Sequence, residues 1–165
     1  MLALLDWIEE DLPDLLFLQR EAWKDVYVDY HAPFVERLWR PWKHYRIYLH
    51  RILPCASNEA LFHPHPWPSA MKVVSGSYEM AIGYGSGMRA PPHAAKVILP
   101  KGSIYEMTEP DAWHYVRPIG GPSLSIMVTG EPWNRETHKS PTPLSPLSFE
   151  RREALFRDFF SHYPH

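Results

Sequence analysis

Residues 62–76 read FHPHPWPSAMKVVSG, and this stretch decides the fold. In an extended chain, side chains two residues apart point to the same face, so His63 and His65 project together. Imidazole nitrogens are common ligands of divalent metal ions, and two of them on one strand can share an ion. The apolar run that follows ends at Gly76, which indicates a turn into a further strand. The segment therefore predicts a strand that presents a histidine pair to the interior of a β-rich protein.

From Tyr45 onward, short segments rich in aromatic and aliphatic residues alternate between apolar and polar side chains, as strands do. Turns containing Gly and Pro separate them, and the 18 prolines of the chain fit many fixed turns better than a helical bundle. Such short strands with frequent turns are typical of a closed barrel or a sandwich. We predict strands at residues 45–53, 71–74, 78–84, 95–99, 104–107, 114–117 and 124–129.

The two ends of the chain favour helices. From residue 2 to about 40, apolar residues fall three or four apart, with Pro13 expected to divide two helices. This amphipathic section should lie across the outside of a sheet or against a second subunit. A proline-rich connector covers residues 134–146, and a last helix is expected from Ser148, a plausible N-cap, to Phe160.

A second unit of turn and histidine, PKGSIYEMTEPDAWH, occupies residues 100–114. With it, the chain resembles the cupin superfamily, whose two motifs are G-x5-H-x-H-x3/4-E-x6-G and G-x5-P-x-G-x2-H-x3-N. The resemblance covers roughly residues 45–133. The first motif is matched in register and the second loosely, with one extra residue before the last histidine; the matching residues are His63, His65 and Gly76, then Gly102, Pro110 and His114.

The resemblance implies a mainly β fold, a single cupin jelly-roll β-barrel. It does not cover the two ends, where the spacing of apolar residues adds N-terminal helices and a C-terminal helix. The chain would form one domain over residues 1–165. Within it, residues 1–44 would be a helical N-terminal extension, residues 45–133 the barrel, and residues 134–165 a connector and the C-terminal helix. His63, His65 and His114 would hold one divalent metal ion, with Fe(II) favoured and Zn, Mn or Ni as alternatives.

The glutamate ligand of the first cupin motif is missing, because Ser69 or Ala70 stands at its position. A three-histidine site leaves positions open for water, substrate or dioxygen, and it resembles those of cupin-type thiol dioxygenases and some diketone-cleaving oxygenases. A cupin that has lost its metal would show the same change. Glu79 and Glu106 are candidates for a replacement ligand or a general base, and ordinary exposure to solvent is the alternative for both.

Several aromatic and basic side chains are candidates for binding the substrate by strand parity or by their nearness to the ligands. Arg51 and Arg117 could pair with a substrate carboxylate, or lie on the surface. We interpret the basic cluster Arg37, Arg40, Lys43 and Arg46 as surface, with an anion site as the alternative. His31 and His138 have no partner spacing and are left aside. The substrate-binding candidates are Tyr48, His50, Arg51, Trp67, Tyr105 and Trp113.

The predicted function is that of a mononuclear non-haem iron(II) dioxygenase acting on a small organic molecule. A metal-dependent lyase or isomerase could use the same site, because the fold does not determine the chemistry. A non-catalytic cupin that binds a small molecule is the second class of function. A third is an epimerase-like barrel, in which a histidine acts as base without a metal.

The charge and composition of the chain limit the classes of partner that it could bind. The net charge of −2 and the lack of a basic stripe argue against nucleic acid, and no apolar run approaches the roughly 18 residues of a membrane span. The single Cys55 fits a reducing compartment, and the acidic N-terminal stretch is unlike an export signal. We therefore expect a cytoplasmic protein that binds a small molecule. The amphipathic N-terminal helices offer apolar surface for a homodimer.

Overall fold

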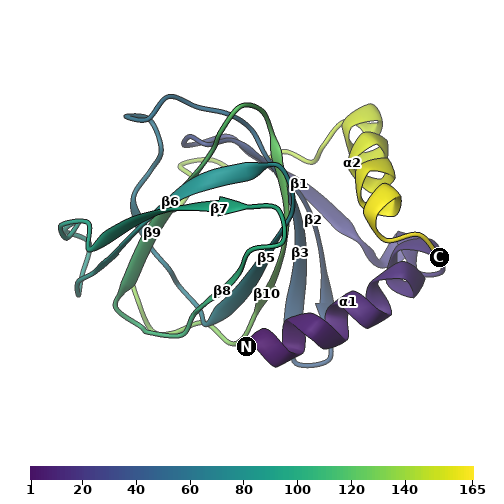
Figure 1. The fold of residues 1–165 in the computed structure, drawn as a ribbon, viewed down its shortest axis with the longest axis horizontal. Helices are drawn as coiled ribbons and strands as arrows, with labels where there is room; N and C mark the ends of the chain where they lie inside the picture. The colour runs from purple at the N-terminus through teal and green to yellow at the C-terminus, as the bar shows by residue number, and fades with distance from the viewer.

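The computed structural model describes residues 1–165 as two antiparallel sheets with one helix near each end of the chain (Figure 1). The helices are α1 (Leu2–Phe17) and α2 (Phe149–His162), and a short 3-10 turn, Arg20–Ala22, follows α1. In spatial order, the larger sheet contains β1 (Lys24–Val28), β2 (Val35–Trp42), β3 (Tyr45–Ile52), β10 (Ser123–Thr129), β5 (Ser69–Ser75) and β8 (Ile104–Met107). The smaller sheet contains β4 (His63–Pro64), β9 (Ala112–Pro118), β6 (Ser77–Tyr84) and β7 (Ala95–Pro100).

The mainly β architecture of jelly-roll type is confirmed. Each of the seven predicted strands is present, with bounds that differ from the prediction by no more than a few residues. Strand hydrogen bonds run within each sheet and not from one sheet to the other, so the barrel is open and the molecule is a two-sheet sandwich. The predicted C-terminal helix is also present, and the Ser148 side chain accepts a hydrogen bond from the backbone N–H of Arg151 as an N-cap does.

The helical extension predicted for residues 1–44 is correct only for α1. Pro13 lies inside this helix and does not divide it. From Lys24 onward the chain forms β1 and β2, which pair with each other and, through β2, with β3. Helical spacing of apolar residues is a local signal, and here pairing with a neighbouring strand outweighs it.

The main hydrophobic core lies between the two helices and the outer face of the larger sheet (Figure 1). The apolar face of α1 is therefore covered by the chain's own sheet, which removes the argument for a dimer through that face, and the homodimer stays a prediction. Neither helix is long and apolar enough to cross a membrane. The core residues include Leu5, Ile8, Leu12 and Leu16 of α1, Leu155, Phe156 and Phe159 of α2, and Leu38, Ile47, Leu49, Ile126 and Val128 of the sheet.

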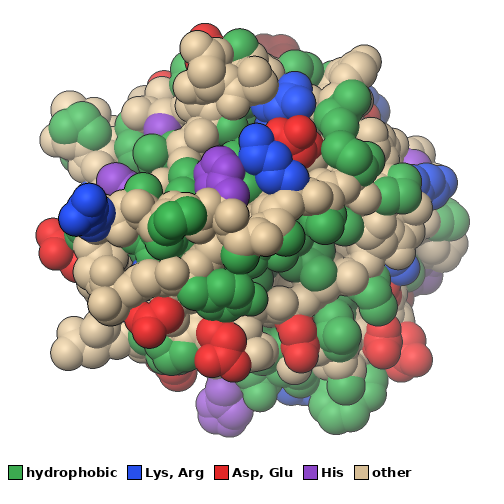
Figure 2. All heavy atoms as spheres, turned by 60° about the vertical axis from the view of Figure 1, so that its left-hand side comes forward, with side chains coloured by type: hydrophobic (Ala, Val, Ile, Leu, Met, Phe, Trp, Pro, Cys, Tyr) green, Lys and Arg blue, Asp and Glu red, His purple; other side chains and the backbone are tan.

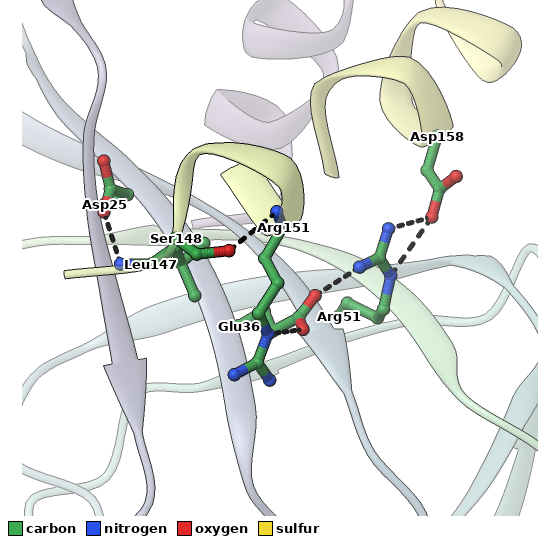
Figure 3. A network of polar contacts seen from close by, with 7 residues as sticks. All are labelled: Asp25, Glu36, Arg51, Leu147, Ser148, Arg151 and Asp158. Carbon is green, nitrogen blue, oxygen red and sulfur yellow. Dashed lines mark hydrogen bonds and ion pairs between the residues drawn. The ribbon is translucent and has the colours of Figure 1, made fainter. Parts of the chain in front are cut away.

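A network of ion pairs fastens α2 to the larger sheet (Figure 3). The carboxylate of Glu36, on β2, accepts hydrogen bonds from Arg51 and from Arg151, and Glu36 is only 4 % exposed. Arg51 also contacts Asp158 of α2. Because strand residues alternate between faces, Glu36 and Arg51 belong to the helix-covered face. The opposite face, which looks toward the smaller sheet, is left for other side chains.

The surface carries charges of both signs. On the face shown in Figure 2, several acidic side chains lie along the lower part, and the basic ones lie in the upper centre and at the two edges. Hydrophobic side chains lie between them. No continuous basic patch covers this face.

Candidate metal centre and ligand cavity

A cavity of about 220 Å³ lies between the two sheets. This volume is below the roughly 300–1,000 Å³ of pockets that take drug-sized ligands, so a ligand enclosed here would be small. The lining contains six histidines and one arginine, and it contains no Asp, Glu or Lys. The ionisable residues of the lining are Tyr30, His31, Arg37, His50, His63, His65, His114 and His138.

Three of these histidines come together because β4 pairs with β9. His63 lies directly opposite His114 in this antiparallel pair, and the backbone N–H of His65 donates to the carbonyl of Ala112 at 3.0 Å. The ring centres of His63 and His114 are 4.8 Å apart, and those of His65 and His114 are also 4.8 Å apart. The three predicted metal ligands therefore share one end of the cavity.

The hydrogen bonds of the rings show which nitrogens remain free. The Nδ1 of His63 donates to the Leu61 carbonyl at 2.9 Å, and that of His65 to the Trp67 carbonyl at 2.8 Å. A carbonyl oxygen only accepts, so Nδ1 carries the hydrogen and the Nε2 of each neutral ring keeps its lone pair. The Nδ1 of His114 is buried without a hydrogen-bond partner. Unprotonated imidazole nitrogens are the chemical type of donor that divalent metal ions accept.

Burial keeps the three rings neutral. It lowers the pKa of His63 to about 3 and that of His65 to about 4, because a charged imidazolium would lose its hydration. Burial, followed by the neighbouring His63 and His65, also places the pKa of His114 well below its ordinary value. Neutral imidazole is the form that coordinates metal.

The rings do not form a finished metal site as they stand. No group of three or more His, Cys, Asp or Glu side chains is arranged so that it could hold an ion. The ring nitrogens would therefore have to come closer together for an ion to bind. At the position of the missing glutamate, Ser69 is fully buried, and its Oγ lies 3.5 Å from the Nδ1 of His65.

The metal-free protein is expected to lose stability as the pH falls from about 6.5 toward 4. The unfolded chain takes up protons on His65 near pH 6.5, whereas the folded chain does so only near its pKa of about 4. Between these two pH values, His65 lowers the free energy of unfolding by up to about 1.4 kcal/mol for each unit by which the pH falls. Above pH 6.5 this histidine no longer makes the free energy of unfolding depend on pH. Urea unfolding from pH 7 to pH 4 should give a shallower decline for His65→Gln than for the wild type. Parallel declines would contradict the assignment.

Glu79 and Glu106, predicted as catalytic carboxylates, lie elsewhere. Glu79 accepts a hydrogen bond from the Tyr115 hydroxyl at 2.7 Å and lies 3.5 Å from Arg117. Glu106 forms an ion pair with the N-terminal amine of Met1 at 3.1 Å. Neither lines the cavity. Strand alternation turns both glutamates away from the space between the sheets. The sequence did not reveal this, because alternation along a single strand does not show which of its two faces is the inner one.

Substitutions at these two glutamates are expected to leave the metal content unchanged. Glu79→Gln and Glu106→Gln preserve the shape of each side chain and remove only a surface ion pair, which is worth little. Iron bound per protein after reconstitution is the measurement. A loss of iron in either variant would bring that carboxylate back as a ligand.

The predicted substrate-binding residues divide into two groups. His50 and Trp67 line the cavity. Tyr48 does not, although it lies beside His50 with ring centres 5.9 Å apart. Arg51 lies on the opposite face of the larger sheet, where Glu36 and Asp158 neutralise it, so it is not available to a substrate in the cavity.

Tyr105 and Trp113 are also outside the lining. The Tyr105 hydroxyl donates to the sulfur of Met71 at 2.8 Å and accepts from the Tyr78 hydroxyl at 3.1 Å. Trp113 is fully buried, and its Nε1 donates to the Gly85 carbonyl at 2.8 Å. As the neighbour of His114 on a strand, Trp113 points to the other face. Both residues are parts of the packing.

Sequence reasoning missed the one arginine and two of the histidines of the lining. Arg37, interpreted as part of a basic surface cluster, faces the cavity from β2, and its Nε donates to the Nε2 of His50 at 3.0 Å. Residues 35–39 read VERLW and do not alternate between apolar and polar side chains, so no local signal placed Arg37 on the inner face of a strand. His31 and His138 come from segments outside the sheets, and His31 has its ring centre 5.8 Å from that of His63. Only the tertiary structure brings these two histidines to the site.

Comparison with known proteins gives a likeness in fold. No family model and no curated protein sequence matches the chain. Among solved structures, hydroxypropylphosphonic acid epoxidase from S. wedmorenis matches with a TM-score of 0.50 at 19% identity, over 66% of this chain and 56% of that one. A structure of the same enzyme in complex with fosfomycin matches with a TM-score of 0.47 at 17% identity, over 58% and 50%. The structure of Fe(II)-HppE with the alternative substrate (S)-1-HPP matches with a TM-score of 0.47 at 17% identity, over 58% of this chain and 49% of that one.

The chain thus spans about half the length of these solved proteins. At such low identity the likeness concerns the fold alone. It agrees with the cupin-like fold that the two histidine motifs predicted.

Proposed function

We propose that this chain is a mononuclear non-haem metal protein, most specifically an iron(II) dioxygenase that oxidises a small organic molecule. The observation that supports it best is the meeting of three neutral histidines at one end of a small cavity. His63 and His65 each present a free Nε2, and the buried Nδ1 of His114 has no partner in the protein. These nitrogens would hold the ion.

The donor set also suggests how the site would work. A bound ion would supply a Lewis acid and redox-active centre that orients its ligands. With no carboxylate in the cavity lining, neutral imidazoles leave its charge uncompensated and leave positions open for other ligands. The carbonyls of Leu61 and Trp67 orient two of the rings, as partners of metal-binding histidines commonly do. The small volume restricts both solvent and substrate.

The choice of iron rests on the resemblance to cupin dioxygenases. Imidazole suits Zn, Mn and Ni as well, so the same three histidines would also support a lyase or isomerase reaction. A non-catalytic binding module is the second candidate function. It is favoured by the lack of any acid in the cavity lining, which leaves no carboxylate as metal ligand or general base.

Metal analysis of the protein separates these functions. Protein purified without added metal, and the same protein after anaerobic reconstitution with Fe(II), should contain close to one ion per chain. His63→Ala should contain far less, because it loses one of three ligands, whereas Glu79→Gln serves as the matched control outside the cavity. If the wild type takes up no metal and His63→Ala keeps the wild-type stability, the metal-dependent function is excluded and the binding module remains.

A further inference from the structure

Arg37 is a cation in the cavity that no carboxylate neutralises. On β2 its guanidinium donates from Nε to His50 Nε2 at 3.0 Å and lies 5.2 Å from the centre of the Tyr48 ring. These two contacts orient the group, but neither supplies a negative charge. Five arginines outside the cavity have an acidic partner, namely Arg20, Arg51, Arg117, Arg151 and Arg152. Arg37 is the one arginine of the cavity lining, and it has none.

The surroundings of Arg37 offer no hidden counter-charge. The cavity lining contains no Asp or Glu, and its other ionisable groups are six histidines and Tyr30. Histidine carries no negative charge in either of its ordinary protonation states. Burial raises the pKa of Tyr30, so its hydroxyl carries no negative charge either. A guanidinium enclosed without an anion is unfavourable, and an anionic ligand would relieve that penalty.

We propose that the cavity binds a small organic acid whose carboxylate is held by Arg37. Because Nε is engaged by His50, the two Nη groups remain to donate to the two carboxylate oxygens as a fork. Tyr48 and His50 are positioning residues that hold the guanidinium in place. The carboxylate of the ligand would thus supply the negative charge that the cavity lining lacks.

The position of Arg37 determines how the ligand would be oriented in the cavity. Arg37 and His50 belong to the larger sheet, whereas His63 and His114 belong to the smaller one. The carboxylate would therefore lie against one wall, and the rest of the molecule would extend toward the histidines on the other. That this far end reacts there rests on the proposed function, but binding of the acid by Arg37 does not require the ion.

Binding of butyrate by metal-free protein tests the proposal. Calorimetric or NMR titration compares butyrate with butyramide, which has nearly the same shape and no charge. Charge-assisted hydrogen bonds are expected to make butyrate bind about 10–100 times more tightly. In Arg37→Met this preference should disappear, and in Arg37→Lys it should be partly kept, because lysine retains the charge and loses the fork.

Arg40→Met is the matched control. Arg40 lies on the same strand, bonds to Gln19 with Nη2 at 2.8 Å and does not line the cavity, so the preference for butyrate should persist. Equal affinity of the wild type for butyrate and butyramide would overturn the proposal, as would an unchanged preference in Arg37→Met. If Arg37→Met does not fold, the wild-type pair and Arg37→Lys decide. Propylphosphonate that binds as tightly as butyrate would overturn the assignment of a carboxylate.

The same titration after Fe(II) reconstitution separates this proposal from the metal-dependent function. Metal uptake without an Arg37-dependent preference would refute the acid site and leave the metal centre standing. An Arg37-dependent preference in a protein that takes up no metal would support the acid site and remove the metal centre. Circular dichroism of each variant shows whether the fold is retained.

Discussion

His114→Leu is expected to weaken Fe(II) binding by more than about 100-fold while the protein stays folded. Loss of an outer partner of a ligand alone costs about 10–100-fold in metal affinity, so loss of a ligand should cost more. His114 is also the ring that approaches both others, at 4.8 Å from each. Leucine has a similar volume, and it removes a buried Nδ1 that has no partner, so the free energy of unfolding of the metal-free protein should change little.

Competition of the protein with a chelator for Fe(II) measures the affinity, and urea unfolding measures the stability. His44→Leu, at an exposed histidine outside the cavity, is the matched control. An unaltered Fe(II) affinity in a folded His114→Leu variant would show that His114 is not a ligand. Should leucine prevent folding, His114→Gln keeps a polar side chain at this position and permits the same comparison.

Glu36→Ala is expected to lower the free energy of unfolding by about 3–5 kcal/mol, the usual effect of removing one partner from a buried ion pair. Glu36 is 4 % exposed and binds both Arg51 and Arg151, which join β3 and α2 to β2 (Figure 3). Without it, two guanidinium groups remain close together with one carboxylate, Asp158, near Arg51. Since folded domains are stable by only about 5–15 kcal/mol, the effect is large.

Chemical denaturation followed by circular dichroism measures this loss. Asp158→Ala is the control in the same network, because the Asp158 side chain is 43% exposed and water replaces its contact. It should cost no more than about 1 kcal/mol, as exposed ion pairs do. If Glu36→Ala proves no more destabilising than Asp158→Ala, the buried carboxylate is not what holds α2 on the sheet.

Local rules located the strands from Tyr45 onward and the pair His63 and His65, and the resemblance to the cupin motifs added His114. The period of two along a strand places His63 and His65 on one face, and the second motif supplies His114; the structure brings all three to one cavity. Turn residues and alternation likewise located the strands from Tyr45 onward. These features depend on neighbours a few residues apart, which is why the sequence alone contains them. Their role as metal ligands stays a prediction.

The tertiary structure decided what surrounds the histidines. Residues 24–28 and 35–42 are strands because β1 pairs with β2 and β2 pairs with β3. The pairing of β2 with β3 turns Arg37 into the cavity and Glu36 toward the helices. It also turns Glu79 and Glu106 away from the site. A charge along one strand has no known face until its partner strand is known, because a shift of one residue exchanges the two faces. The sequence thus determined a histidine cluster in a β-rich fold. Only the assembled sheets decided that the cavity beside this cluster contains no Asp or Glu and one arginine without an acidic partner.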